Sequence, residues 1–438
     1  MSGPLTIIGG GLAGAEAAWQ AARRGLDVTL CEMRPARGTG AHHTDRLAEL
    51  VCSGSLKSTV VTSASGLLNA EMDLLGSLVL ACAHASAIPG GQALAVDRDE
   101  FSQRVTDAIE GEPRITLRRG EVAEVPRAGL VIVASGPLTS ETLAADLQVI
   151  TGAGQLAFFD AIAPTVTTES IDLDIAFAAS RYGKGSDDYL NCPLDRAQYQ
   201  QFHEALVAAE RFVPKCAEDT QYFEGCLPIE VIAERGLDAP RFGPLKPVGL
   251  LDPRTEKRPW AVVQLRRENR AGTLYSLVGC QTQLRRGEQE RVFRLVPGLE
   301  HADFARYGQV HRNTFFDSPR LLLPTLQLRT RPDLWLAGQL IGVEGYVESA
   351  AAGWLAGVNA ARLAGGAEPL TPPETTMIGA LLRHVSDPWV KVFQPMNANF
   401  GLLPTLDVRD KQARKQAYAD RARADLAVWF RSTGDAAG

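Results

Sequence analysis

The sequence lacks the patterns that mark membrane spans and metal-binding cysteine motifs. Its 438 residues contain no run of eighteen apolar residues, so we expect no membrane-spanning helix and no membrane partner. The seven cysteines include no pair at CxxC spacing, which argues against a zinc ribbon or a dithiol redox motif, and no metal site is predicted. A strand is expected to begin within the first five residues, which leaves no room for a signal peptide. These absences favour a cytoplasmic protein with reduced thiols.

An excess of positive charge is also absent. The formal net charge is −6 at pH 7, so a nucleic-acid partner would have to be met by local basic patches. Residues 235–270 hold nine Arg or Lys against four acidic residues, with Phe242 and Trp260 among them. Residues 409–423 form a helical pattern with six Arg or Lys and two Asp. Both stretches suit a phosphate-rich partner, and for both an ordinary solvated surface remains the alternative.

The strongest pattern that is present lies in residues 5–34. Leu5–Ile8 is a short apolar run, residues 15–24 have helical periodicity, and a second strand over residues 28–31 leads to Glu32. Three glycines between the first strand and the helix have GxGxxG spacing: Gly9, Gly11 and Gly14. With an acidic residue 18 positions after the last glycine, this is the β–α–β pattern of a dinucleotide-binding fold.

Each part of this pattern has a physical role in holding a dinucleotide. The glycines permit a tight turn, let backbone N–H groups approach a pyrophosphate and let the helix pack closely on the strand. The helix N-terminus favours the pyrophosphate, and Glu32 would accept a hydrogen bond from a ribose hydroxyl. Since its charge disfavours a 2′-phosphate, the predicted nucleotide is FAD or NAD rather than NADP. The predicted contacts are Gly9, Gly10, Gly11, Leu12, Ala13, Gly14, Glu32, Met33 and Arg34.

A second glycine-rich unit lies in residues 333–363. A strand over residues 334–337 is followed by a glycine-rich turn, and a helix is expected to begin near Tyr346. Its N-terminus, aimed at the same cofactor, would stabilise an anionic reduced flavin, which favours FAD over NAD. Since no second GxGxxG is present, NADH or NADPH would dock transiently as reductant. The predicted contacts are Gly338, Gln339, Gly342, Val343, Glu344 and Gly345, together with Gly136 after an expected strand over residues 129–134.

These two units predict an α/β protein with a Rossmann-like FAD-binding domain made of two sequence segments. From about residue 156 the chain becomes richer in aromatics, prolines and irregular stretches, which is typical of an inserted α+β substrate domain. The predicted divisions are residues 1–155 and 301–438 for the two FAD-binding segments, the second with a C-terminal helix, and 156–300 for the inserted, substrate-facing domain. Other predicted elements are strands over residues 115–117 and 121–125 and helices over residues 95–110 and 195–210.

Cys52 is a candidate reactive thiol. We expect residues 53–55 to form a turn and a helix N-cap, with the helix continuing over residues 67–80. A thiol beside a helix N-terminus, with Lys57 one turn further on, has an environment that favours the thiolate. A buried structural cysteine remains the alternative for this position.

Two further features are less specific. Cys226 lies in a turn between Gly225 and Pro228, which would fix the position of its thiol. His42 and His43 lie in a loop that is expected to wrap the adenosine end of the nucleotide. We expect both to be solvated, and a role as ligand or base is the alternative.

Longer motifs resemble one family of bacterial enzymes, the folate- and FAD-dependent tRNA (uracil-5-)-methyltransferases. The similarity extends over nearly the whole chain, and the family is related to a larger flavoenzyme that modifies the wobble uridine of tRNA. The chain departs from the family at Gly54, where Asn is more usual, and at Lys57, where Arg is more usual. The motifs that carry the resemblance are IIGGGLAGAEAAWQ, LVCSGSLKS, ALAVDRDEF, SGPLTSETL, SRYGKG, YLNCP, FEGCLPIEV, FGPLKPVGL, KRPWAVVQLR, YGQVHRNTFFDSP, AGQLIGVEGYVESAAAG and FQPMNANFGLL.

The resemblance implies a reaction and a set of partners. Methylenetetrahydrofolate would supply a carbon to C5 of the T-loop uridine at position 54 of tRNA, and NADH or NADPH would supply electrons through FAD. Cys52 would add to C6 of the uracil and Cys226 would remove the C5 proton, with the reverse assignment left open. The family pattern also makes Tyr346, His311, Arg312 and Lys57 candidates for the substrate pocket.

Two other function classes remain open at this stage. One is a flavin-dependent NAD(P)H oxidoreductase acting on a small molecule, with both cysteines structural. The other is a non-catalytic RNA-binding protein in which FAD only holds two domains together. The oligomeric state is not predicted by any of these patterns.

Overall fold

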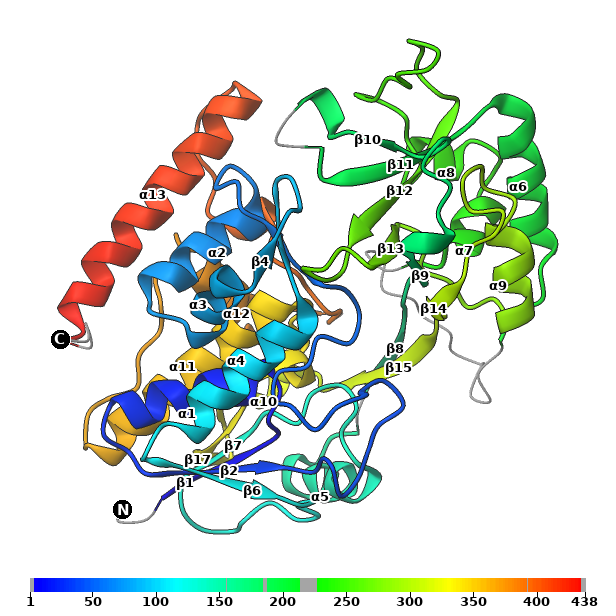
Figure 1. Ribbon diagram of the computed structural model, residues 1–438. Helices are drawn as coiled ribbons and strands as arrows, with labels where there is room; N and C mark the ends of the chain where they lie inside the picture. The colour runs from blue at the N-terminus through cyan, green and yellow to red at the C-terminus, as the bar shows by residue number, and fades with distance from the viewer. Residues whose placement is uncertain (1–3, 155, 184–186, 213–226, 392, 435–438) are drawn as a thin grey trace.

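A mostly parallel β-sheet forms the centre of the first of two bodies (Figure 1). The computed structural model describes residues 4–154, 156–183, 187–212, 227–391 and 393–434. The sheet has the strand order β16-β17-β7-β1-β2-β6, in which β16 alone is antiparallel to its neighbour. Its strands are β1 (Leu5–Ile8), β2 (Val28–Glu32), β6 (Ile115–Arg119), β7 (Val131–Val133), β16 (Gln327–Leu328) and β17 (Arg331–Leu336). The predicted two-segment Rossmann-like fold is confirmed, because β17 of the second unit pairs with β7 beside β1.

The helices of the two glycine-rich units pack directly on each other. These are α1 (Leu12–Arg23) and α11 (Tyr346–Ala364). A Cβ atom at Gly353 would lie 2.1 Å from the carbonyl oxygen of Ala13, and one at Gly357 would lie 2.4 Å from that of Ala17. Only glycine allows the two backbones to come this close. The contact brings the N-termini of both helices to the same edge of the sheet.

The segment after Cys52 is a strand, so the helix N-cap predicted at residues 53–55 is wrong. β3 (Ser55–Ser58) pairs with β5 (Ala93–Val96), which also pairs with β4 (Ala87–Ile88). The helix begins later because the side chain of Ser63 caps α2 (Ala64–Leu74) by accepting from the N–H of Gly66. The predicted helix over residues 67–80 is also divided, since Ser77 caps a separate helix, α3 (Leu78–Ala85).

No single helix among the described residues is long and apolar enough to cross a membrane. Taken together, α2 and α3 meet the same length and composition test, but they are bent by 107° at the break between them. Both helices contribute buried residues to the core of the first body.

The second body has an antiparallel sheet and a hydrophobic core of its own (Figure 1, green). The strand order is β10-β11-β12-β13-β9-β14. The helix predicted over residues 195–210 is confirmed as α6 (Arg196–Ala208), which Asp195 starts with a capping box. The strands are β9 (Thr165–Thr167), β10 (Phe177–Ala178), β11 (Tyr189–Leu194), β12 (Ala261–Arg267), β13 (Leu274–Val278) and β14 (Phe304–Arg306), and further helices are α7 (Ile229–Glu234), α8 (Ala239–Phe242) and α9 (Arg286–Phe293).

A two-stranded ribbon joins the bodies. In it, β8 (Leu156–Ala161) pairs antiparallel with β15 (Val310–Phe315). The first core uses residues up to Leu147 and again from Phe315 onward, whereas the second core lies between Val166 and Phe304. The domain divisions after residues 155 and 300 stay a prediction.

Two buried glutamates hold helix N-termini in the first body. Glu16 of α1 accepts from the N–H groups that begin α3, and Glu71 of α2 accepts from Met377 and Ile378 at the start of α12. The strand predicted over residues 121–125 is wrong, because the N–H of Val125 donates to the Asp146 side chain instead of to a neighbouring strand. The remaining elements are α4 (Arg98–Glu110), α5 (Glu141–Thr151), α10 (Ser318–Leu321), α12 (Met377–His384), α13 (Lys411–Ser432), η1 (Thr168–Ser170), η2 (Arg181–Gly183), η5 (Gly338–Ile341) and η6 (Phe400–Leu402).

Candidate active site

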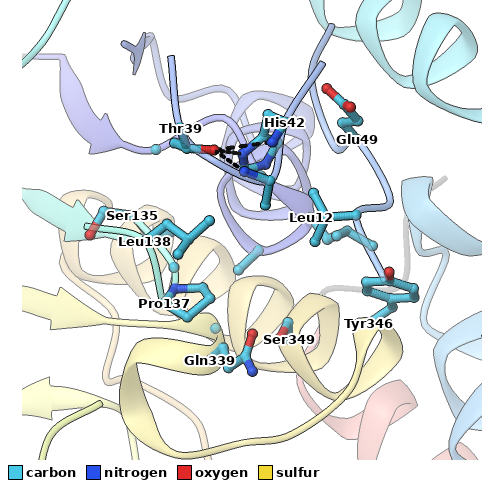
Figure 2. A pocket seen from close by; sticks show the side chains of 18 of the residues that line it. Leu12, Thr39, His42, Glu49, Ser135, Pro137, Leu138, Gln339, Tyr346 and Ser349 are labelled. Carbon is cyan, nitrogen blue, oxygen red and sulfur yellow. Dashed lines mark hydrogen bonds between the residues drawn. The ribbon is translucent and has the colours of Figure 1, made fainter. Parts of the chain in front are cut away.

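A cavity of about 470 Å³ lies at the carboxyl ends of β1, β2, β7 and β17. Residues from β8, β12 and β15 close it from the side of the second body. In open α/β sheets this edge is where ligands bind, because strand order reverses there. Figure 2 shows side chains from separate segments around this space: Thr39 and His42, Ser135, Pro137 and Leu138, Gln339 and Ser349, and Tyr346.

Both helices that reach the cavity begin with a glycine that provides no side-chain cap. Gly11 is the N-cap of α1 and Gly345 is the N-cap of α11. A Cβ atom at Gly11 would meet no other atom within 4 Å, so the space in front of α1 is open. First-turn N–H groups have no partner within their own helix, and they favour anions. The space in front of α11 is less open, because a Cβ atom at Gly345 would lie 2.1 Å from Oε2 of Glu348 and 2.6 Å from Nζ of Lys57.

The turn before α1 requires glycine for two reasons. Gly9 has a φ of +106°, and a Cβ atom there would lie 2.4 Å from the carbonyl oxygen of Ala134. A Cβ atom at Gly14 would lie 1.8 Å from the carbonyl oxygen of Gly9. The first and third glycines of the motif thus allow the tight turn and the close contact between helix and strand.

At one end of the cavity, Glu32 is held as a carboxylate. Its Oε2 accepts from the N–H of Gly10 at 2.9 Å, and its Oε1 accepts from Nε of Arg34 at 2.9 Å. Burial alone would raise the pKa of Glu32, but the hydrogen bonds and charge of Arg34 and the N–H of Gly10 outweigh it and hold the pKa below its ordinary value. An acceptor with a fixed negative charge suits a ribose hydroxyl and opposes a phosphate.

The start of α11 holds a cluster of ionisable groups. Nζ of Lys57 lies 2.6 Å from Oε1 of Glu348 and 3.4 Å from the carbonyl oxygen of Glu344. The side-chain amide of Gln339 donates to both carboxyl oxygens of Glu344, at 2.9 and 2.7 Å. Burial and the nearby Asp160 raise the pKa of Glu344 to about 8, so this carboxyl group holds a proton at neutral pH.

Cys52 also lines the cavity, next to Tyr346. The Tyr346 hydroxyl oxygen accepts from the N–H groups of Cys52 at 2.8 Å and Ser53 at 3.1 Å. Burial and the nearby Asp160 raise the pKa of the Cys52 thiol above its ordinary value, so the thiol is protonated. The thiolate environment expected from the sequence is wrong, because Cys52 precedes a strand and the ammonium of Lys57 is paired with Glu348.

The cavity brings together most of the predicted site residues. Gly14, Gly342, Val343 and Arg312 do not line it, and Arg312 is exposed on the opposite face of β15 from His311. Cys226 lies outside the described residues. The predicted residues that line the cavity are Gly9, Gly10, Gly11, Leu12, Ala13, Glu32, Met33, Arg34, Cys52, Lys57, Gly136, His311, Gln339, Gly338, Glu344, Gly345 and Tyr346.

Comparison with known proteins identifies the family. The family model described as "Glucose inhibited division protein A" matches residues 4–368. A methylenetetrahydrofolate–tRNA-(uracil-5-)-methyltransferase TrmFO from Symbiobacterium thermophilum is 57% identical over 431 residues, covering 97% of this chain and 96% of the relative. The TrmFO of Moorella thermoacetica is 56% identical over 440 residues, with both chains covered completely. The chain belongs to the TrmFO family.

Solved structures support the same fold for this TrmFO-family chain. GidA of Aquifex aeolicus, in two crystal forms, is 18% identical and superposes with a TM-score of 0.70. The similarity covers 97% of this chain and 73% or 76% of the GidA chains. At this identity the likeness establishes the shared fold alone.

The TrmFO-family cavity also contains residues that were not predicted to line it. His42, expected to be solvated, lines the cavity, and burial together with the charge of Arg34 lowers its pKa to about 4. Asn313 had a usable signal, because it lies two residues from His311 on the same face of a strand. Asp160 and Arg266 had none, since strand pairing between distant segments places them. Among the described residues, no three His, Cys, Asp or Glu side chains are grouped in a way that would hold a metal ion.

Proposed function

We propose that this protein transfers a one-carbon unit from methylenetetrahydrofolate to C5 of a uracil in tRNA and reduces it to a methyl group. The target proposed is the T-loop uridine at position 54, with FAD as cofactor and NADH or NADPH as reductant. Membership of the TrmFO family supports the reaction class. The observation that carries the proposal is that Cys52 shares one cavity with two glycine-capped helix N-termini.

The residues around the cavity fit FAD. The open space in front of Gly11 and the first turn of α1 would hold the pyrophosphate, and Glu32 would accept from a ribose hydroxyl. Gly338 and the first turn of α11 would face the isoalloxazine ring. When bound, FAD would supply the electrons that convert the transferred carbon to a methyl group.

The chain itself would activate the uracil. C5 of uracil becomes nucleophilic when a thiolate adds to C6, and Cys52 is the cavity thiol proposed for that step. Burial raises the pKa of Cys52, so its thiol is protonated before substrate binds. The backbone of Cys52 is already fixed by Tyr346. Cys226 would remove the C5 proton, and the reverse division of labour between the two thiols is the alternative. The target uridine would leave its stack to enter the cavity.

One assay separates this function from the two other classes. Purified protein is incubated with unmodified tRNA, NADH or NADPH and methylenetetrahydrofolate labelled in its methylene carbon. Label in tRNA supports the proposal, and its loss with a tRNA that carries cytidine at position 54 supports the target. NADH oxidation that is indifferent to tRNA and folate would indicate a small-molecule oxidoreductase. RNA binding without turnover would indicate a non-catalytic protein.

Cysteine variants test the thiols. Cys52→Ala and Cys226→Ala should each abolish methyl transfer while the protein keeps its flavin absorbance. Cys82→Ala is the matched control, because Cys82 is a buried thiol of α3 that does not line the cavity. Turnover close to that of the control would remove the substituted cysteine from the mechanism.

A further inference from the structure

Three arginines from three elements lie near one another at the junction of the two bodies, and two of them, Arg98 and Arg266, lie beside Cys52. Arg98 is the first residue of α4, Arg266 lies in β12 and Arg306 ends β14. Arg98 forms an ion pair with Oε2 of Glu268, and Arg266 lies 3.0 Å from Oε1 of the same carboxylate. The exposed fraction of the side chain is 12% or less for each of Arg98, Arg266 and Glu268. One buried carboxylate thus serves two buried cations.

Arg306 adds a third cation without adding a carboxylate. Burial and the charge of Arg98 lower the pKa of Arg306, so the guanidinium lies close enough to be repelled. Two carboxylates act on Arg306. One is Glu268, which Arg98 and Arg266 already share, and the other is Glu49, which already binds Arg34 at 3.1 Å. Within the described part of the chain, the Arg306 guanidinium forms neither an ion pair nor a hydrogen bond.

This arrangement favours an added anion. Arg306 is half-buried, and a partly desolvated cation without a partner is less stable than one in water. Arg98 also stands in the first turn of a helix, where the helix dipole disfavours positive charge. The Nε atoms of Arg98 and Arg266 are buried and have no hydrogen-bond partner among the described residues. The cluster has donors and charge in excess of what the chain itself uses.

Two members of the cluster lie beside Cys52. Arg98 donates to the carbonyl oxygens of Leu50 and Cys52, each at 3.4 Å. Arg266 lines the cavity together with Cys52. An anion held here would therefore sit next to the thiol and on the seam between the two bodies.

We propose that Arg306, supported by Arg98 and Arg266, binds an oxyanion of the substrate beside Cys52. This inference rests on the proposed function, whose two substrates both carry such a group. An RNA chain brings a phosphodiester next to each base, and a folate brings the carboxylates of its glutamate tail. Guanidinium groups suit either, because they donate two parallel hydrogen bonds to a planar or tetrahedral oxyanion.

The first test measures anion binding without turnover. The flavin-loaded protein is heated with inorganic phosphate or with sodium chloride at equal ionic strength, so that the cofactor site is filled. Phosphate should raise the melting temperature of the wild type and of Arg320→Ala, a control that removes an arginine exposed on α10. It should raise that of Arg306→Ala much less. Equal phosphate effects in all three proteins would overturn the proposal, whatever the outcome of the methylation assay.

The same variants separate a ligand-binding role from a structural one. In the absence of anion, Arg306→Ala should be at least as stable as the wild type, since it removes a cation that Arg98 repels. A clear loss of stability, together with unchanged substrate affinity, would show that Arg306 only supports the fold. Arg306→Lys keeps the charge but loses the paired N–H donors of the guanidinium. Its rise in melting temperature with phosphate should lie between those of the wild type and Arg306→Ala.

Kinetic arms identify which substrate supplies the anion. If it is a tRNA phosphate, Arg306→Ala should raise the KM for tRNA about tenfold or more and lower the slope of log affinity against log salt by about one. If it is a folate carboxylate, the KM for methylenetetrahydrofolate should rise instead and the salt slope for tRNA should stay unchanged. A variant with both KM values at the wild-type level contradicts the proposal. Failure of the wild type to methylate tRNA contradicts the proposed function and leaves the phosphate test to decide on the site.

Discussion

The hydroxyl of Tyr346 accepts a hydrogen bond of 2.8 Å from the backbone N–H of Cys52, across 294 positions of sequence. The same oxygen accepts from Ser53 at 3.1 Å. Tyr346 is the first residue of α11, so the second glycine-rich unit directly fixes the backbone of Cys52 in the first body. This contact links the proposed cofactor end of α11 to the proposed nucleophile.

Replacing Tyr346 by Phe should therefore slow methyl transfer. The variant removes the acceptor of two N–H groups and lets the Cys52 backbone move. Leaving these N–H groups without a partner costs about 1–3 kcal/mol if no water replaces the hydroxyl. We expect kcat to fall about tenfold or more with the KM for tRNA nearly unchanged, because positioning of the thiol matters at the reaction step. Steady-state kinetics on the flavin-loaded variant measures this. An unchanged kcat would mean that water replaces the hydroxyl without consequence.

Replacing Glu32 should weaken the hold on FAD. Glu32→Gln loses the negative charge that binds Arg34 and puts an amide donor near the N–H of Gly10. We expect the dissociation constant for FAD to rise about tenfold or more, since a charged hydrogen bond is worth about 1.5–3 kcal/mol. Fluorescence titration of the deflavinated protein gives the constant. Glu204→Gln on the exposed face of α6 is the control, and equal affinity in both variants would contradict the assignment.

Glycines of α11 should be essential for stability. Gly353→Ala places a Cβ atom against the backbone of α1, where the nearest atom, the Ala13 carbonyl oxygen, lies at 2.1 Å. Overpacking of this kind costs about 1–3 kcal/mol or more, which urea denaturation measures. Gly287→Ala is the matched control, because Gly287 is also helical but has no atom within 4 Å of its built Cβ. It should gain about 0.5–1 kcal/mol from helix propensity. A stable Gly353→Ala variant would show that the helices can separate.

Part of the predicted basic surface is already neutralised. Arg254 binds Asp252 through two nitrogens, at 2.9 and 2.8 Å, whereas Lys257 and Arg258 are exposed in the same groove as Trp260. Reversing Lys257 and Arg258 to Glu should raise the KM for tRNA and flatten its salt dependence by about one to two units of slope. Arg320→Glu controls for net charge. An unchanged slope would show that Lys257 and Arg258 are ordinary solvated residues that do not bind tRNA.

Local patterns account for the parts of the fold that the sequence predicted well. The turn at Gly9 and the unit that leads to Tyr346 combine apolar strands, glycines and helical periodicity within about thirty residues, so their geometry depends on near neighbours. The error after Cys52 has a local cause of another kind. Two serine-rich turns compete as helix starts, and the one at Ser63 is used because Ser55 is drawn into a strand with β5.

The rest of the site depends on contacts between distant segments. Arg98 meets Glu268 only because the second sheet docks against α4, and Asp160 reaches the cavity only because β8 pairs with β15. No spacing rule connects such positions. The contrast between His311 and Arg312 is different, since alternation along a strand would have placed one inside and the other outside.

The buried carboxyl of Glu71 should make stability depend on pH. It accepts from Met377 and Ile378 at 2.7 and 2.8 Å, but burial outweighs these bonds and raises its pKa from 4.5 to about 8. Between these two values the folded state binds a proton that the unfolded state has lost. The contribution of Glu71 to stability is therefore full below pH 4.5 and falls as pH rises toward 8, with a limiting slope of about −1.4 kcal/mol per pH unit.

Glu71→Gln removes this titration and provides the test. The free energy of unfolding of the wild type, measured in urea at pH 5, 6, 7 and 8, should fall relative to that of Glu71→Gln at each step. Glu204 is exposed on α6, so the free energy of unfolding of Glu204→Gln should change with pH in the same way as that of the wild type. If Glu71→Gln also runs parallel, Glu71 is ionised in the folded protein, and the two N–H groups at the start of α12 outweigh its burial. The N-terminus of α12 would then be held by a charged group, which a neutral amide should replace only at a loss of stability at every pH.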